Sequence, residues 1–132
     1  TVKKEIVSGK SISLCFPKHN IYSSAIVGGI LPIALGTALG IKRKKSSAMV
    51  YCFIGDMTSE TGIMHESLKY AMNFNLPIRF IIEDNNLSVC TDTRKVWNLK
   101  KLSNQNIKNK FVISYKYKNK YPHAGAGQRV QF

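Results

Sequence analysis

The residues of this chain that are best suited to chemistry lie in two polar clusters, each directly after an apolar run. Gly55 and Asp56 follow the first run, and Asn85 follows the second. A carboxylate and an amide oxygen are hard donors of the kind that Mg²⁺ prefers, and phosphate oxygens and water commonly complete its octahedron. The pair therefore predicts a clamp for Mg²⁺ and a phosphate-containing ligand.

Each cluster also has a purely structural interpretation. Asp56 is a residue type that caps the N-terminus of a helix, and Asn85 with Asn86 is typical of a tight turn. For either cluster alone, the structural interpretation is favoured. The two clusters together, at the ends of successive apolar runs, favour a binding site.

These clusters need a scaffold that brings them to the same place. Residues 49–54 and 78–82 are continuous apolar runs without alternation, typical of strands buried on both faces of a parallel sheet. Between them, residues 61–74 carry apolar side chains at helical spacing, so the segment predicts a βαβ unit. Ligands bind beyond the carboxyl ends of such strands, which lie about 4.8 Å apart, so both clusters can reach one ion. We expect the helix that begins near Thr61 to point free N–H groups at an anion there.

The whole chain of 132 residues predicts one α/β domain, with a core over 25–93 and a basic tail over 94–132. A glycine-rich loop before residue 30 leads into a segment whose small and apolar residues predict a buried helix. The remaining expectations are a loop with one short element over 1–24, the helix over 30–44, partial helix over 92–110, an edge strand over 111–117 and an irregular tail over 121–132.

The net charge of +13 raises the possibility of nucleic-acid binding. The lysines fall mainly at 42–45 and 95–120, and no known nucleic-acid-binding signature accompanies them. A bias toward Lys, Asn and Ile can also result from the base composition of the coding DNA, without any role in binding. We therefore expect no nucleic-acid partner.

Membrane insertion is also not expected. The long apolar stretch over 25–41 is interrupted by several glycines and by Pro32, whereas a membrane span needs about 20 mostly apolar residues. The three cysteines, Cys15, Cys52 and Cys90, lack the spacing of a disulfide framework or a zinc site, which favours a cytoplasmic protein. The chain does not begin with Met, and we expect it to be part of a longer polypeptide.

The polar clusters and their surroundings resemble a known family. Gly55-Asp56 followed by Asn85 resembles the GDG...N fingerprint of thiamine-diphosphate-dependent enzymes. The likeness is greater to the alpha subunits of 2-oxoacid dehydrogenases, including pyruvate and acetoin dehydrogenases, and covers roughly residues 9–93. The further matching positions are Gly62, His65-Glu66-Ser67-Leu68, Leu76-Pro77, Glu83-Asp84-Asn85, and the loop Ala25-Ile26-Val27-Gly28 with Pro32.

The resemblance implies a truncated or partial version of a three-layer, parallel-sheet thiamine-diphosphate-binding fold. It also implies that Asp56, Asn85 and the Leu87 carbonyl bind Mg²⁺. His65 and Glu66 match a helix position of the family, where we interpret them as supporting the fold or a subunit contact, with direct catalysis as a lesser alternative. The implied cofactor-binding set is Ala25, Ile26, Val27, Gly55, Asp56, Met57, Thr58 and Asn85, of which 25–27 would face the aminopyrimidine ring and Met57 and Thr58 would lie along the diphosphate.

Two positions depart from the family pattern, since Met57 replaces the final glycine of the fingerprint and Ser13 stands where many relatives have histidine. By the resemblance, the chain acts on a 2-oxoacid or a ketose, in decarboxylation or transketolase-like two-carbon transfer. A beta-type partner subunit would supply the activating glutamate at the interface of a homo- or hetero-oligomer. The alternative is a non-catalytic assembly or regulatory module that retains the fold.

Overall fold

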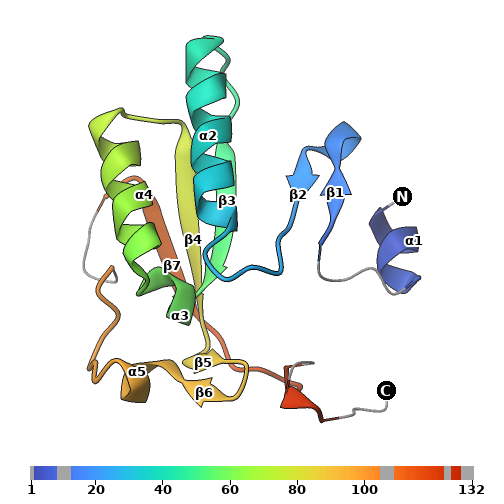
Figure 1. Cartoon of the computed structure of the whole chain (residues 1–132), viewed down its shortest axis with the longest axis vertical. Coiled ribbons are helices and arrows are strands. Elements are labelled where there is room, and N and C mark those ends of the chain that lie inside the picture. Colours follow the sequence, from blue (N-terminus) through green and yellow to red (C-terminus); the bar gives the residue numbers. More distant parts are fainter. Residues whose placement is uncertain (1, 9–12, 105–108, 124–125, 129–132) are drawn as a thin grey trace.

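The structure is a computed structural model that describes residues 2–8, 13–104, 109–123 and 126–128. At its centre is a three-stranded parallel sheet (Figure 1). Its strands stand in the order β3 (Val50–Gly55), β4 (Ile78–Asp84) and β7 (Val112–Lys116). The register places Gly55 opposite Glu83, so the predicted polar clusters follow neighbouring strands at the same edge of the sheet. This confirms the parallel α/β fold and the edge position of β7.

Two helices cover one face of the sheet, α2 (Ile30–Arg43) and α4 (Gly62–Asn73) (Figure 1). Both lie within about two residues of their predicted bounds, because their apolar residues repeat at helical spacing. Small side chains let α2 lie close to the sheet and to α4. The core between the helices and the strands includes Leu31, Ala34, Ala38, Cys52, Ile54, Met64, Leu68, Ala71, Ile78, Phe80 and Ile82. Burial raises the pKa of the Cys52 thiol to about 11, in keeping with a packing role.

The opposite face of the sheet is open. Tyr51 and Phe53 of β3 are 60% and 58% exposed, and Ile113 and Tyr115 of β7 are 48% and 44% exposed. The prediction that the residue 49–54 strand is buried on both faces is therefore wrong, because α2 and α4 lie on the same side of it. The described residues form two layers of the expected three, as a partial version of that fold would.

The N-terminal region holds more structure than the single short element expected from the sequence. It contains α1 (Val2–Val7), and a hairpin of β1 (Cys15–Phe16) and β2 (Ile21–Tyr22) around the 3-10 helix η1 (Pro17–His19). In Figure 1 this region lies to one side of the sheet. Among its described residues, 92–104 and 109–110, the segment predicted as partly helical contains the four-residue helix α5 (Thr93–Val96). This helix follows a second small hairpin of β5 (Leu87–Ser88) and β6 (Thr91–Asp92).

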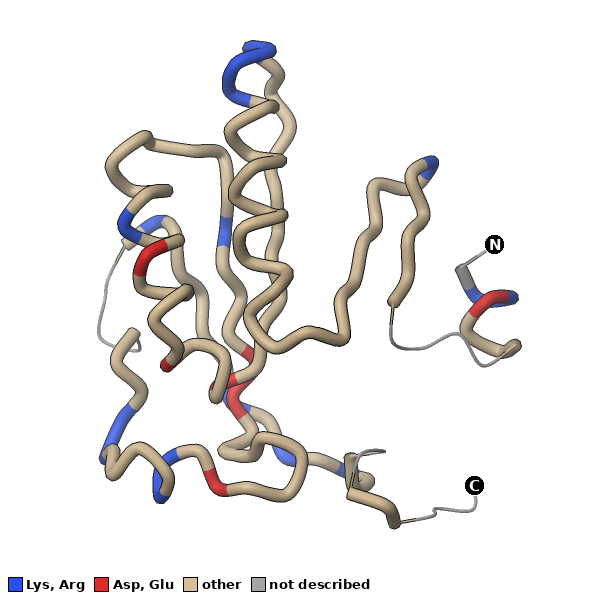
Figure 2. The backbone as a smooth tube through the Cα atoms, viewed as in Figure 1, with Lys and Arg blue, Asp and Glu red and all other residues tan. Residues whose placement is uncertain are grey.

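No helix within the described ranges has both the length and the apolar character needed to cross a membrane. The three cysteines are free, with Cys52 buried and the other two exposed. The basic residues at 42–45 lie at the far end of α2, remote from the carboxyl ends of the strands (Figure 2).

The loop before α2 turns at Gly28, which has a φ of +78°. A Cβ atom at this position would lie 2.9 Å from Ile63 Cγ2, near the start of α4. We expect Gly28→Ala to lower the free energy of unfolding by about 1 kcal/mol from backbone strain alone, measured by urea unfolding. Gly36→Ala is the matched control, because a Cβ there meets nothing within 4 Å and alanine favours a helix. Equal stability of the two variants would contradict the requirement for glycine at position 28.

Candidate functional site

The chain forms a short helix, α3 (Asp56–Ser59), immediately after β3. Two hydroxyls stabilise this turn, since Ser59 Oγ donates to the Asp56 carbonyl at 2.7 Å and Thr61 Oγ1 donates to the Thr58 carbonyl at 2.7 Å. The predicted helix near Thr61 is present as α4, but the sequence analysis did not include α3. The backbone amides directly after β3 therefore belong to α3 and not to α4.

Asp56 is the most distinctive residue at the strand ends. Its side chain is 1% exposed, and Oδ2 has no hydrogen-bond partner among the described residues. Burial raises the pKa of the Asp56 carboxyl, although the nearby Thr93 hydroxyl and the Arg94 charge act in the opposite direction. The Thr93 hydroxyl also lacks a partner that meets hydrogen-bond geometry in the described part of the chain. A buried polar atom without a partner is costly, and a bound cation would satisfy this one.

The neighbouring acid, Asp84, is also buried, but its carboxylate has a counter-ion. It is 2% exposed and makes a two-pronged ion pair with Arg94, whose Nη1 and Nη2 donate to Oδ1 and Oδ2 at 3.0 and 2.7 Å. Arg94 Nη1 also donates to Asn86 Oδ1 at 2.8 Å. The Arg94 guanidinium holds the pKa of the Asp84 carboxyl below its usual range. Asp84 is thus already neutralised within the chain, whereas Asp56 is not.

Asn85 lies at the turn that follows β4. Its Oδ1 accepts a hydrogen bond from the Leu87 N–H at 3.0 Å, and its Nδ2 donates to Asn119 Oδ1 at 2.9 Å. An amide oxygen has two lone pairs, so one bond from Leu87 leaves capacity for a metal ion. The strand β5, which contains Leu87, packs against α3. The structure therefore brings the Leu87 segment to the helix that carries Asp56.

The other predicted residues also lie near this edge of the sheet. The loop that contains Ala25, Ile26 and Val27 is exposed, and the adjoining Gly28 is buried beside Ile63, near the start of α4. Met57 and Thr58 are half-buried on α3. His65 and Glu66 lie on the exposed side of α4, where they are accessible to another subunit. Their proposed roles stay predictions.

The sequence interpretation missed the contribution of α5. Thr93 lies near Asp56, Arg94 binds Asp84, and the indole Nε1 of Trp97 donates to Met57 Sδ at 3.0 Å. The sequence carried one signal for this helix, because Asp92 is a residue type that favours the capping position. In the structure, the Asp92 side chain accepts a hydrogen bond from the Lys95 N–H at 2.9 Å. The contacts across the fold had no such signal.

A second segment, Ser103 and Asn104, also contacts α3 and the residue after it. Asn104 is 2% exposed, and its Nδ2 donates to the Ser59 carbonyl at 3.1 Å. The backbone N–H and the hydroxyl of Ser103 donate to the Glu60 carboxylate at 2.9 and 2.6 Å. These contacts fix the turn on which Asp56 is placed.

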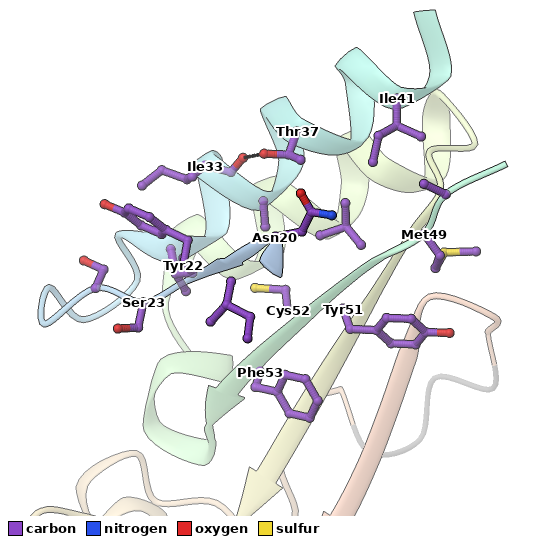
Figure 3. Close-up of a pocket in the computed structure, with 16 residues that line it drawn as sticks. Asn20, Tyr22, Ser23, Ile33, Thr37, Ile41, Met49, Tyr51, Cys52 and Phe53 are labelled. Atoms are coloured by element: carbon purple, nitrogen blue, oxygen red, sulfur yellow. Dashed lines mark hydrogen bonds between the residues drawn. The ribbon is translucent and has the colours of Figure 1, made fainter. Parts of the chain in front are cut away.

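Among the cavities that the described residues form, two lie beside the sheet. A polar cavity of about 540 Å³ lies at the ends of β4 and β7 and is lined by Asp84, Asn85, Asn86, Arg94, Lys116, Tyr117 and Lys118. A mainly apolar cavity of about 780 Å³ lies between β2, α2 and β3 (Figure 3), with Tyr22, Ile33, Cys52 and Phe53 among its walls. The polar cavity is the one that adjoins the predicted site.

Comparison with known proteins gives a consistent result. A sequence model of the dehydrogenase E1 component family matches residues 3–110. The alpha subunit of acetoin:2,6-dichlorophenolindophenol oxidoreductase of Bacillus subtilis is 32% identical over 96 residues, which cover 64% of this chain and 29% of that protein. The pyruvate dehydrogenase E1 component subunit alpha type II, mitochondrial, of Ascaris suum is 29% identical over 90 residues, covering 67% of this chain and 23% of that protein.

Among solved structures, a chain described as a thiamin diphosphate-dependent enzyme isolated from Mycobacterium smegmatis aligns with 49% of this chain and 12% of its own length. The identity is 28% and the TM-score is 0.44. This chain spans less than a third of the length of the two curated relatives.

Proposed function

This chain belongs to the dehydrogenase E1 component family, and from that membership we propose that it is the cofactor-binding part of an alpha-type subunit of a thiamine-diphosphate-dependent 2-oxoacid dehydrogenase. The observation that carries the proposal is the buried Asp56 carboxylate, whose Oδ2 has no hydrogen-bond partner in the described part of the chain. It stands at the end of a parallel strand, where ligands of such sheets bind.

The residues present fit a Mg²⁺-diphosphate group. Asp56, Asn85 and the Leu87 carbonyl would hold the ion, since all three supply the oxygen donors that Mg²⁺ prefers. Asp84 is excluded from this set, because Arg94 already occupies both of its oxygens. Arg94 thereby neutralises Asp84 and leaves Asp56 as the carboxylate proposed to bind the ion.

The rest of the cofactor would contact other parts of this edge. Met57 and Thr58 would lie along the diphosphate, and the loop of residues 25–27 would face the pyrimidine ring. When bound, thiamine diphosphate supplies an electron sink for cleavage of a bond beside a carbonyl group. The work of this chain is to bind the cofactor, to hold its charged end in place and to balance that charge.

The chain would complete its active site with a second polypeptide. We propose a beta-type subunit that supplies the activating glutamate, in a cytoplasmic homo- or hetero-oligomer. Exposed residues of α4, including His65 and Glu66, are available for such a contact. The substrate class proposed is a 2-oxoacid, with two-carbon transfer from a ketose as the less favoured reaction. The pyruvate dehydrogenase relative of Ascaris suum supports this class.

A second candidate is a non-catalytic assembly or regulatory module. Its support is Met57, whose side chain is half-buried next to Asp56 and adds bulk where an anion would approach. In that case the fold and the subunit contact would be retained while cofactor affinity would be lost.

Calorimetric titration separates these two functions. We expect saturable binding of thiamine diphosphate in the presence of Mg²⁺, and its loss when a chelator removes the metal. Thiamine without phosphate is the matched control ligand, and it should bind weakly under the same conditions, because the metal clamp acts on the diphosphate. Absence of thiamine diphosphate binding, even with a beta-type subunit added, would favour the non-catalytic module.

A further inference from the structure

The contact between Met57 and Trp97 connects two elements that are distant in sequence. Trp97 ends α5, while Met57 lies in the first turn of α3, directly after Asp56. The indole Nε1 donates to Met57 Sδ at 3.0 Å, although Trp97 as a whole is 47% exposed. The polar atom of a partly exposed indole is thus directed at a thioether instead of at water.

Met57 occupies a position where an uncontrolled side chain would interfere with binding. Any anion that accompanies Mg²⁺ at Asp56 must approach the residue that follows it. Methionine is unbranched and flexible, with three rotatable side-chain bonds, and its free side chain would sample the space beside the carboxylate. A hydrogen bond to sulfur limits that sampling.

The same short helix makes two other contacts at the strand ends. Thr93 lies near Asp56, and Arg94 pairs with Asp84. Trp97 is therefore carried by an element that is already fixed at the candidate site. Its direction toward Met57 is set by that anchoring, and the contact can be formed before any ligand binds.

On the basis of the proposed function, we propose that Trp97 is a positioning residue for the diphosphate end of the cofactor. By holding Met57 Sδ, it keeps the methionine side chain in one arrangement, so that the side chain no longer samples the space through which the diphosphate would approach Asp56. Met57 thereby becomes compatible with anion binding. Trp97 itself has no assigned contact with the cofactor.

A double-mutant cycle tests this role. Trp97→Phe keeps an aromatic ring but removes the N–H donor, and Met57→Ala removes the side chain that the donor holds. The loss is that of one hydrogen bond, so we expect Trp97→Phe to weaken binding of Mg²⁺ with thiamine diphosphate by roughly 3- to 10-fold. In the Met57→Ala background, the same change should alter the affinity less than about 2-fold, since nothing remains to be positioned.

Several measurements distinguish positioning from a structural contact. A contact that only stabilises the fold would lower the melting temperature of Trp97→Phe and leave the affinity unchanged, which would overturn the proposal. Equal weakening in both backgrounds would also overturn it. Titration with Mg²⁺ and inorganic diphosphate should reproduce the same coupling, because the role concerns the diphosphate end. Val96→Ala is the control on the same helix, where the side chain is 54% exposed, and its affinity should match that of the unmodified chain.

The outcome also separates this inference from the proposed function. Trp97 is the single tryptophan of the chain, so its fluorescence reports the contact without any ligand. We expect Met57→Ala to shift that emission. Failure of both the unmodified chain and Met57→Ala to bind either probe would overturn the proposed function and the inference with it. Normal binding by Trp97→Phe would overturn the inference alone.

Discussion

Replacement of Arg94 by methionine is expected to lower the free energy of unfolding by about 3 kcal/mol at neutral pH. The change leaves the Asp84 carboxylate buried at 2% exposure without its counter-ion, and it also removes the bond to Asn86. The expected loss is at the lower end of the range for buried pairs, because the Arg94 side chain is 19% exposed. Urea unfolding measures it.

The loss of stability in Arg94→Met should depend on pH. The Asp84 pKa is lowered in the folded chain, so its stabilising contribution is fully present above the unfolded pKa of about 3.9 and is lost as the pH falls through the lower folded value. The difference between the unmodified chain and Arg94→Met should therefore shrink in acid. Adding Asp84→Asn should recover much of the loss at neutral pH.

Lys95→Met is the matched control for Arg94→Met, because it removes an exposed positive charge from the next position of α5. It should change the free energy of unfolding by less than about 0.5 kcal/mol. A loss below 1 kcal/mol for Arg94→Met would show that the ion pair is not required to neutralise Asp84.

Asp56→Asn is expected to act in opposite directions on binding and on stability. Binding of Mg²⁺ with thiamine diphosphate should weaken on the order of 100-fold or more, since changes behind the metal ligands alone cost about 10- to 100-fold. Without ligand, the variant should be more stable than the unmodified chain by about 1 kcal/mol, because a buried carboxylate without a partner no longer has to ionise. Calorimetry and urea unfolding measure the two effects.

Burial raises the Asp56 pKa, which determines how the stability gain depends on pH. The contribution of this carboxyl is fully favourable below the unfolded pKa of about 3.9 and is lost as the pH rises through the higher folded value. The advantage of Asp56→Asn should thus grow with pH and vanish in acid. Saturating ligand should reverse the order at neutral pH, because it stabilises the unmodified chain by about 2.7 kcal/mol at 100 times the dissociation constant.

If Asp56→Asn lowered stability in the absence of ligand at neutral pH, the carboxylate would have a favourable partner within the folded chain. If it bound the cofactor with normal affinity, Asp56 would not be a metal ligand.

The strands β3 and β4 and the helices α2 and α4 were predictable from the sequence because each one has a strong hydrophobic signal of its own. The short helix α3 was not, since Asp56–Ser59 is one turn long and is held by side-chain hydroxyls. Periodicity also does not reveal which face of β3 is covered. That depends on the side to which each connecting helix returns.

The position of the candidate site could be predicted from the sequence, but the pairing of charges within it could not. Parallel strands had to bring Asp56 and Asn85 to one edge, and the register confirms this. Which acid keeps its negative charge unpaired depends on Arg94, and the shape beside Asp56 depends on Trp97. Both contacts join positions that no local pattern relates, so only the folded chain reveals them.

The open face of the sheet and the net charge have opposite effects on association between copies of the isolated chain. The exposed apolar side chains of this face favour aggregation; they are Tyr51, Phe53, Ile113 and Tyr115. The net charge of +13 opposes aggregation, because the molecules repel one another. Salt weakens only the repulsion, because the Debye length falls to about 8 Å at physiological ionic strength. Purified material should therefore remain dispersed most readily in dilute buffer.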